Sequence, residues 1–104
     1  MRGLIFTGDR VAEVRDFDQL DPGPGEVRVK IRSSGMCGSD LNTYRKPASD
    51  LANTVKRPGH EPCGEIEAVG AGVTEVQIGD RVIVHHYLGC GHCRYCRQGY
   101  NQLC

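Results

Sequence analysis

Four cysteines close to the C-terminus constrain this chain more than any other feature of its sequence. Cys90, Cys93, Cys96 and Cys104 form the pattern C-x2-C-x2-C-x7-C. The residues between them are mostly glycine and polar, without apolar periodicity, so hydrophobic packing alone cannot order this segment. Two residues between cysteines let one turn direct both thiolates at one ion, and four thiolates complete a structural zinc site. The pattern therefore predicts a structural zinc lobe over residues 86–104.

Three other interpretations of these cysteines are less favoured. Disulfides require an oxidising compartment, for which the sequence gives no sign. A redox pair of the thioredoxin type requires a βαβ context that is missing. An iron-sulfur cluster shares the first two spacings, but here seven residues rather than three precede the fourth cysteine, and no proline follows it. Zinc is the prediction, with an iron-sulfur protein as the weaker alternative.

Composition excludes several classes of partner. The 104 residues include 13 Lys plus Arg and 13 Asp plus Glu, so the formal net charge is zero. General electrostatic attraction to nucleic acid or anionic lipid is therefore not expected. The longest apolar runs are triplets, far below the roughly 20 residues that span a bilayer, so we expect neither a membrane span nor a signal peptide. We expect one domain, no nucleic-acid or membrane partner, and a cytoplasmic location.

The pattern of apolar residues predicts a mainly β fold. Residues 27–32 alternate aliphatic and cationic side chains, which is typical of a strand with one apolar face. A helical turn is expected over residues 40–44 with Ser39 as its N-cap, followed by a loop over residues 45–57. The predicted strands span residues 4–7, 11–15, 27–32, 63–69 and 80–85.

The sequence contains no convincing dinucleotide-binding loop. The nearest match is Gly70-Ala71-Gly72, but Glu75 stands where the third glycine should be. The motif also needs a transition from strand to helix that its surroundings lack. We therefore expect no nucleotide-binding domain within these residues.

A second set of metal-type residues lies outside the lobe. Cys37 is flanked by Gly35 and Gly38, and His60 and Glu61 follow Gly59. A thiolate and a neutral imidazole suit zinc, and a catalytic site uses three protein ligands and keeps one position open. From the residues alone, Cys37 could equally be a small buried hydrophobe and His60 a loop residue.

The order of these motifs along the chain resembles the zinc-containing alcohol and polyol dehydrogenases of the medium-chain dehydrogenase/reductase superfamily. The matching segments are residues 35–40, 59–61, 64–66 and 79–82, followed by the four-cysteine lobe. The resemblance implies that residues 1–104 are a GroES-like β-barrel, the first portion of a catalytic domain that a cofactor domain follows.

The resemblance also implies roles for individual residues. Cys37 and His60 would bind a catalytic zinc ion, and Glu61 would be a nearby carboxylate that can exchange onto the metal. Asp40 would hydrogen-bond the other ring nitrogen of His60. Ser39 would take the proton from the alcohol. The four lobe cysteines would bind a structural zinc ion: Cys90, Cys93, Cys96 and Cys104.

Some residues depart from the family pattern. Asn42 stands where many relatives carry a histidine that passes the proton to solvent, and an amide cannot titrate. Cys63 matches no family role and is expected to be a buried strand residue. The remaining catalytic zinc ligand of the family lies beyond residue 104.

The function expected from this resemblance is hydride transfer between an alcohol or polyol and NAD or NADP, by a homo-oligomeric parent enzyme. The 104-residue chain is then a truncated portion that is inactive alone. The alternatives are a free-standing zinc-stabilised β module with a binding or structural role and, less favoured, the iron-sulfur protein.

Overall fold

The computed structural model describes residues 1–52 and 56–104. Its strands are β1 (Arg2–Gly8), β2 (Val11–Asp16), β3 (Val27–Gly35), β4 (Glu61–Val69) and β5 (Arg81–Ile83). Its helical segments are α1 (Gly38–Tyr44), α2 (Ala48–Leu51), α3 (Arg94–Arg97) and the 3₁₀ turn η1 (Asn101–Leu103). The predicted mainly β class is confirmed. Within the described part of the chain, no helix is long and apolar enough to cross a membrane.

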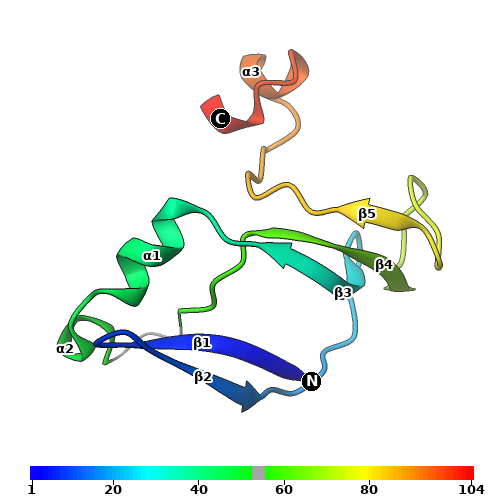
Figure 1. The fold of residues 1–104 in the computed structure, drawn as a ribbon. Coiled ribbons are helices and arrows are strands. Elements are labelled where there is room, and N and C mark those ends of the chain that lie inside the picture. Colours follow the sequence, from blue (N-terminus) through cyan, green and yellow to red (C-terminus); the bar gives the residue numbers. More distant parts are fainter. Residues whose placement is uncertain (53–55) are drawn as a thin grey trace.

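Strands β1 and β2 form the predicted antiparallel hairpin, which lies below the other strands in Figure 1. Asp9 and Arg10 make its turn with positive φ angles of 51° and 63°. Gly8 also has a positive φ, and a Cβ atom there would overlap the backbone of Ala48. Glycine at this position therefore lets the end of β1 approach α2 closely.

The buried apolar residues lie mainly where the helices meet the hairpin. Ile5 and Phe6 on β1 are buried, as is Leu51 on α2, which contacts β1. The Phe6 ring lies 5.3 Å from the Tyr44 ring of α1, between centroids. The prediction of a loop over residues 45–57 is therefore wrong for α2, because packing against β1 outweighs weak periodicity. Residues 53–55 of that prediction lie outside the described residues.

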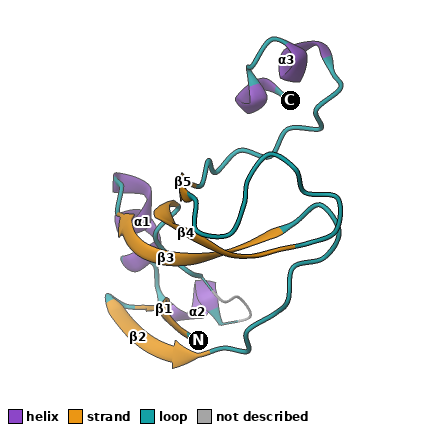
Figure 2. Cartoon of the chain, turned by 90° about the vertical axis from the view of Figure 1, so that its right-hand side faces the viewer, coloured by secondary structure: helices purple, strands orange, loops and turns teal. Residues whose placement is uncertain are grey.

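A second sheet positions the residues of interest. Strands β3, β4 and β5 pair antiparallel in that order. This pairing places the end of β3, the start of β4 and the end of β5 at one end of the sheet (Figures 1 and 2). β3 and β4 are longer than predicted because their pairing continues to Gly35 and Glu61. β5 is shorter than predicted, because its pairing with β4 covers only Arg81–Ile83.

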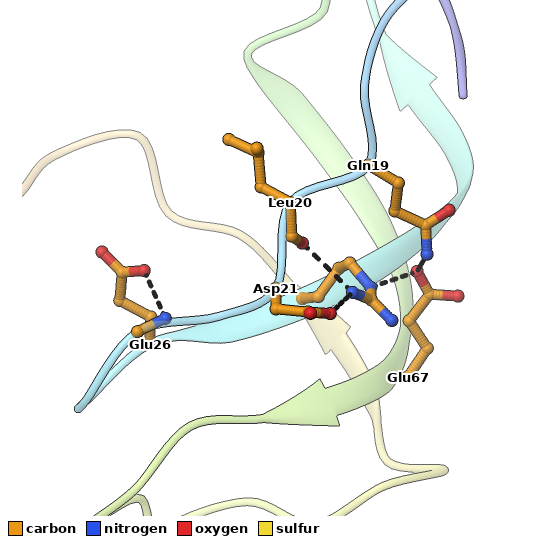
Figure 3. Close-up of polar contacts among 7 residues, drawn as sticks. Gln19, Leu20, Asp21, Glu26 and Glu67 are labelled. Carbon is orange, nitrogen blue, oxygen red and sulfur yellow. Dashed lines mark hydrogen bonds and ion pairs between the residues drawn. The ribbon is translucent and has the colours of Figure 1, made fainter.

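The segment that joins the two sheets is held by one partly buried guanidinium group. Arg28 donates to Glu67 (2.8 Å), to Asp21 (2.8 Å) and to the carbonyl of Leu20 (3.1 Å). Figure 3 shows these groups converging from the connecting segment and from β4. The predicted cationic face of β3 therefore ties the connection to the sheet.

The C-terminal segment stands apart from both sheets in Figures 1 and 2. It contains two short helical turns, α3 and η1, which contact each other. The sequence predicted no regular element here. The difference arises because the Cys93 sulfur accepts a hydrogen bond from the Cys96 amide (3.5 Å) and so begins α3.

Candidate metal centres

The end of the three-stranded sheet brings together Cys37, His60 and Glu61. Cys37 lies between β3 and α1, and His60 directly precedes β4. Gly59 has a φ of 88°, which favours glycine, and its carbonyl accepts a hydrogen bond from the Ser34 hydroxyl (2.8 Å). This turn directs the His60 ring toward Cys37.

The geometry of this cluster fits a zinc ion. Sγ of Cys37 lies 3.1 Å from Nε2 of His60, and one carboxylate oxygen of Glu61 lies within 4.8 Å of both atoms. Ideal tetrahedral zinc with a sulfur and a nitrogen ligand separates the two atoms by about 3.5 Å, so a small opening of the pair accommodates the ion. Sulfur, nitrogen and oxygen donors are the set that zinc prefers.

Asp40 contacts both of these candidate ligands. It is only 6% exposed. Its Oδ2 accepts a hydrogen bond from the Cys37 amide (3.1 Å), and its Oδ1 lies 3.5 Å from Nδ1 of His60. The expected contact between Asp40 and the ring of His60 is thus present in the structure.

The helix begins earlier than predicted. Cys37, not Ser39, is the N-cap of α1, because the Asp40 carboxylate satisfies the Cys37 amide at the first turn. The prediction of Ser39 as N-cap is wrong. Its hydroxyl instead lies 2.9 Å from Sγ of Cys37, inside the candidate site.

The electrostatics of the pair shift the pKa of Cys37 down and the pKa of His60 up. Hydrogen bonds from the side chain and backbone of Ser39 lower the pKa of Cys37, and His60 lowers it further. Desolvation lowers the pKa of His60, but the charges of Cys37 and Asp40 outweigh this effect and raise it. A site that stabilises the thiolate is prepared for a metal cation.

The second cluster consists of the four lobe cysteines. Their sulfur atoms all lie within 4.8 Å of one another, and Sγ of Cys90 lies 3.9 Å from Sγ of Cys96. Tetrahedral zinc with bonds of about 2.3 Å separates sulfur atoms by about 3.8 Å, so the cluster fits one ion. The residues in this cluster are the four that the sequence spacing predicted as zinc ligands: Cys90, Cys93, Cys96 and Cys104.

The four thiols differ in acidity. Backbone hydrogen bonds from His92 and Cys93 lower the pKa of Cys90 to about 6. The Gly91 amide lowers the pKa of Cys96, but desolvation and the neighbouring thiols outweigh it and raise the pKa to about 11. Cys90 is therefore the thiol that is already ionised at neutral pH.

Three further residues lie on or near the elements that form the first cluster. Cys63 lies on β4 as expected, but it is half-buried rather than buried. Asn42 lies exposed on α1. Sequence reasoning did not identify His86, whose ring centroid lies 5.4 Å from that of His60. The only signal in the sequence was its position two residues beyond the predicted β5 core of Val82 and Val84.

Comparison with known proteins identifies related sequences. The family model described as alcohol dehydrogenase GroES-like domain matches residues 23–104. The zinc-type alcohol dehydrogenase-like protein YphC of Escherichia coli is 38% identical over 111 residues, covering 100% of this chain and 31% of its own length. The L-threonine 3-dehydrogenase of Pyrococcus furiosus is 40% identical over 97 residues, covering 89% of this chain and 27% of its own length. The chain thus spans less than a third of the length of these relatives.

Solved structures show the same likeness. A cobalt- and zinc-bound thermostable alcohol dehydrogenase from Pyrobaculum aerophilum has a TM-score of 0.83 and 34% identity, covering 100% of this chain and 32% of its own. An alcohol dehydrogenase (rspB) from Escherichia coli in complex with NADH has a TM-score of 0.80 and 35% identity, covering 100% of this chain and 30% of its own. The resemblance to zinc-containing dehydrogenases is confirmed. The chain belongs to the alcohol dehydrogenase GroES-like domain family.

Proposed function

We propose that residues 1–104 form the N-terminal portion of the catalytic domain of an enzyme that transfers hydride between an alcohol or polyol and NAD or NADP. The observation that carries the proposal is the contact of Cys37 with His60 at one end of the sheet, with the buried Asp40 behind both residues. A structural fold alone would not require a thiol, an imidazole and a carboxylate to converge in this way.

The two clusters would hold two zinc ions with different roles. Cys37, His60 and Glu61 provide three ligands and leave room for a further one, which suits a catalytic site. The four cysteines of the lobe close a complete shell, which suits a structural ion. When bound at the first site, zinc supplies a Lewis acid that lowers the pKa of an alcohol.

The side chains of this chain would orient the site and move the proton. Asp40 fixes the orientation of His60 from its Nδ1 side and holds the Cys37 amide. The Ser39 hydroxyl lies 2.9 Å from Sγ of Cys37, beside the candidate ligands. There it would accept the proton of a bound alcohol while it releases its own hydroxyl proton toward solvent. Because Asn42 cannot titrate, that proton must leave the site without the help of this residue.

The same proposal has consequences for the cofactor domain, the oligomeric state, the compartment and the substrate of the enzyme. The hydride acceptor would bind to a nucleotide-binding domain outside residues 1–104, for which there is room because this chain covers only 31% of the length of the relative YphC. The parent enzyme would be a homo-oligomer. Residues 86–104 would be the structural zinc lobe. All six cysteines are free, which favours a reducing compartment such as the cytoplasm. The relative named L-threonine 3-dehydrogenase supports a secondary alcohol among the candidate substrates.

A second candidate function is a zinc-stabilised β module that binds or supports a partner without catalysis. The lobe favours it, because its four ligands form a complete site that does not depend on Cys37 or His60. An iron-sulfur protein is a further alternative with the same cysteines. The relatives named as dehydrogenases support the enzyme over both.

The test is to express the complete reading frame that encodes this chain and to assay the product with alcohols and polyols in the presence of NAD or NADP, alongside metal analysis. We expect zinc-dependent cofactor reduction that Cys37→Ala abolishes, with the lobe zinc retained because the two sites share no ligand. Zinc binding without cofactor reduction would favour the module. A visible absorption band with bound iron would favour the iron-sulfur protein, since zinc is colourless.

A further inference from the structure

His86 occupies a position that the pairing of β4 with β5 determines. The Val84 amide donates to the Pro62 carbonyl (2.9 Å), so the antiparallel register continues for one pair beyond the end of β5. His86 follows two residues later, and its ring lies beside the ring of His60. The backbone therefore brings a ring from the segment after β5 to the metal cluster at the end of the sheet.

The two rings meet edge to face. Their centroids are 5.4 Å apart and their planes are inclined by 71°. Although His86 is exposed, its own ring is held by its neighbours, since the Tyr87 ring lies 4.1 Å away and the His85 ring 5.4 Å away, between centroids. Contacts of this geometry between aromatic rings are favourable beyond the area they bury.

The contacts described above meet His60 at its two ring nitrogens. Cys37 and Asp40 approach Nε2 and Nδ1, on opposite sides of the ring. Hydrogen bonds act along the N–H and lone-pair directions of these nitrogens, so these two contacts select the direction in which the ring faces. His86 adds a packing contact against the ring from a third element.

We infer that His86 is a positioning residue that holds the His60 imidazole in the orientation in which Nε2 faces Cys37. The inference rests on the proposed metal site and deepens it. The role depends on the shape of the His86 ring and not on its nitrogen atoms, so another aromatic ring of similar size can replace it. It also gives a function to the start of the segment that follows β5, because His86 lies in that segment and contacts His60.

The test compares His86→Ala and His86→Phe with His85→Ala as a matched control. His85 is adjacent in sequence but its ring contacts His86 and Tyr87. With the lobe first loaded with zinc, cobalt is titrated into the chain and its thiolate absorption gives the affinity of the Cys37–His60 site. We expect His86→Ala to weaken cobalt binding about tenfold, as loss of groups that orient metal ligands commonly does. His86→Phe should restore most of the affinity, and His85→Ala should weaken binding less than His86→Ala does, because the Tyr87 ring still lies against His86.

Nuclear magnetic resonance of the His60 ring supplies a readout that needs no metal at this site. Wild type and His86→Phe should show one ring orientation with contacts to residue 86, whereas His86→Ala should show averaging between orientations. Wild-type affinity and ring behaviour in His86→Ala would overturn the inference. Equal losses in His86→Phe and His86→Ala would also overturn it, because they would assign the role to the imidazole nitrogens. Cobalt binding at the lobe alone in every variant would refute the proposed metal site, while the ring spectra still decide the role of His86.

Discussion

Oδ1 of Asp40 lies 3.5 Å from Nδ1 of His60, while the other oxygen of the same carboxylate accepts a hydrogen bond from the Cys37 amide. One buried side chain thus begins helix α1 and orients a candidate metal ligand. The position of the helix and the geometry of the site are consequently determined by the same residue. Substitutions at Asp40 can separate the capping of α1 from the orientation of His60. An asparagine can still accept the hydrogen bond from the Cys37 amide, but it loses the negative charge beside His60.

Asp40→Asn should weaken metal binding at Cys37 and His60 by about 10-fold to 100-fold, since a neutral amide is a poorer partner for the Nδ1–H of a ligating imidazole. The amide oxygen can still accept from the Cys37 amide, so stability should change little. Asp40→Ala should lose the cap as well and lower the free energy of unfolding by about 1 kcal/mol more. Cobalt titration and urea unfolding measure the two quantities. Equal affinity in Asp40→Asn and wild type would contradict the role of the carboxylate.

Removal of metal should loosen the lobe selectively. The lobe stands apart from both sheets and none of the core residues identified in the described part lies within it. A chelator should therefore release about one zinc ion and expose residues 89–104 to trypsin at Arg94 and Arg97, because the ion supplies the order that apolar packing does not. Cleavage rates at basic residues of β3 serve as the internal reference. An unchanged rate of cleavage in the lobe after zinc removal would refute the prediction.

The sequence predicted those elements that are determined by residues close together in the chain. The hairpin follows from two short apolar runs around Gly8 and Asp9, and β3 follows from the alternation that begins at Val27. The convergence of the four lobe cysteines follows from their spacing, since two residues between ligands already form the turn. Zinc at either cluster stays a prediction, because metal analysis is the measurement that decides it.

Features that depend on packing between distant segments were not predictable in this way. α2 has weak apolar periodicity, and its single buried residue, Leu51, forms part of the core beside β1. The meeting of Cys37 with His60 could be proposed only through resemblance to a family, because 22 residues separate them and only the pairing of β3 with β4 brings them together. The contact of His86 with His60 depends in the same way on the register of β5.

The unequal acidity of the lobe thiols predicts how zinc binding depends on pH. Cys90, with a pKa of about 6, is a thiolate at pH 7 and becomes a thiol as pH falls through 6. At pH 5, zinc binding must therefore displace the proton of Cys90, which is already absent at pH 7. Cys96, with a pKa of about 11, loses its proton on zinc binding at either pH. Proton release, measured by calorimetry in buffers of different ionisation enthalpy, should rise by about one between pH 7 and pH 5.

Two variants assign that step to a single thiol. Cys90→Ala should remove the rise in proton release, and Cys96→Ala should keep it. The two amides that lower the pKa of Cys90 most, those of His92 and Cys93, belong to its own turn. Proton release that stays constant between pH 7 and pH 5 in the wild type would contradict the assignment.

The Ser39 hydroxyl is the candidate group for proton transfer from the alcohol. In the complete protein, Ser39→Ala should lower kcat by about 10²-fold to 10⁴-fold, the usual contribution of a positioned proton acceptor. The metal content should stay unchanged, because Cys37, His60 and Glu61 are the candidate ligands. Ser39→Thr keeps a hydroxyl and should retain most of the activity, which makes it the matched control.

Since the hydroxyl also helps to lower the pKa of Cys37, metal affinity must be measured in each variant. A fall in kcat that matches a loss of metal would assign Ser39 to ligand support and would rule it out as the proton acceptor.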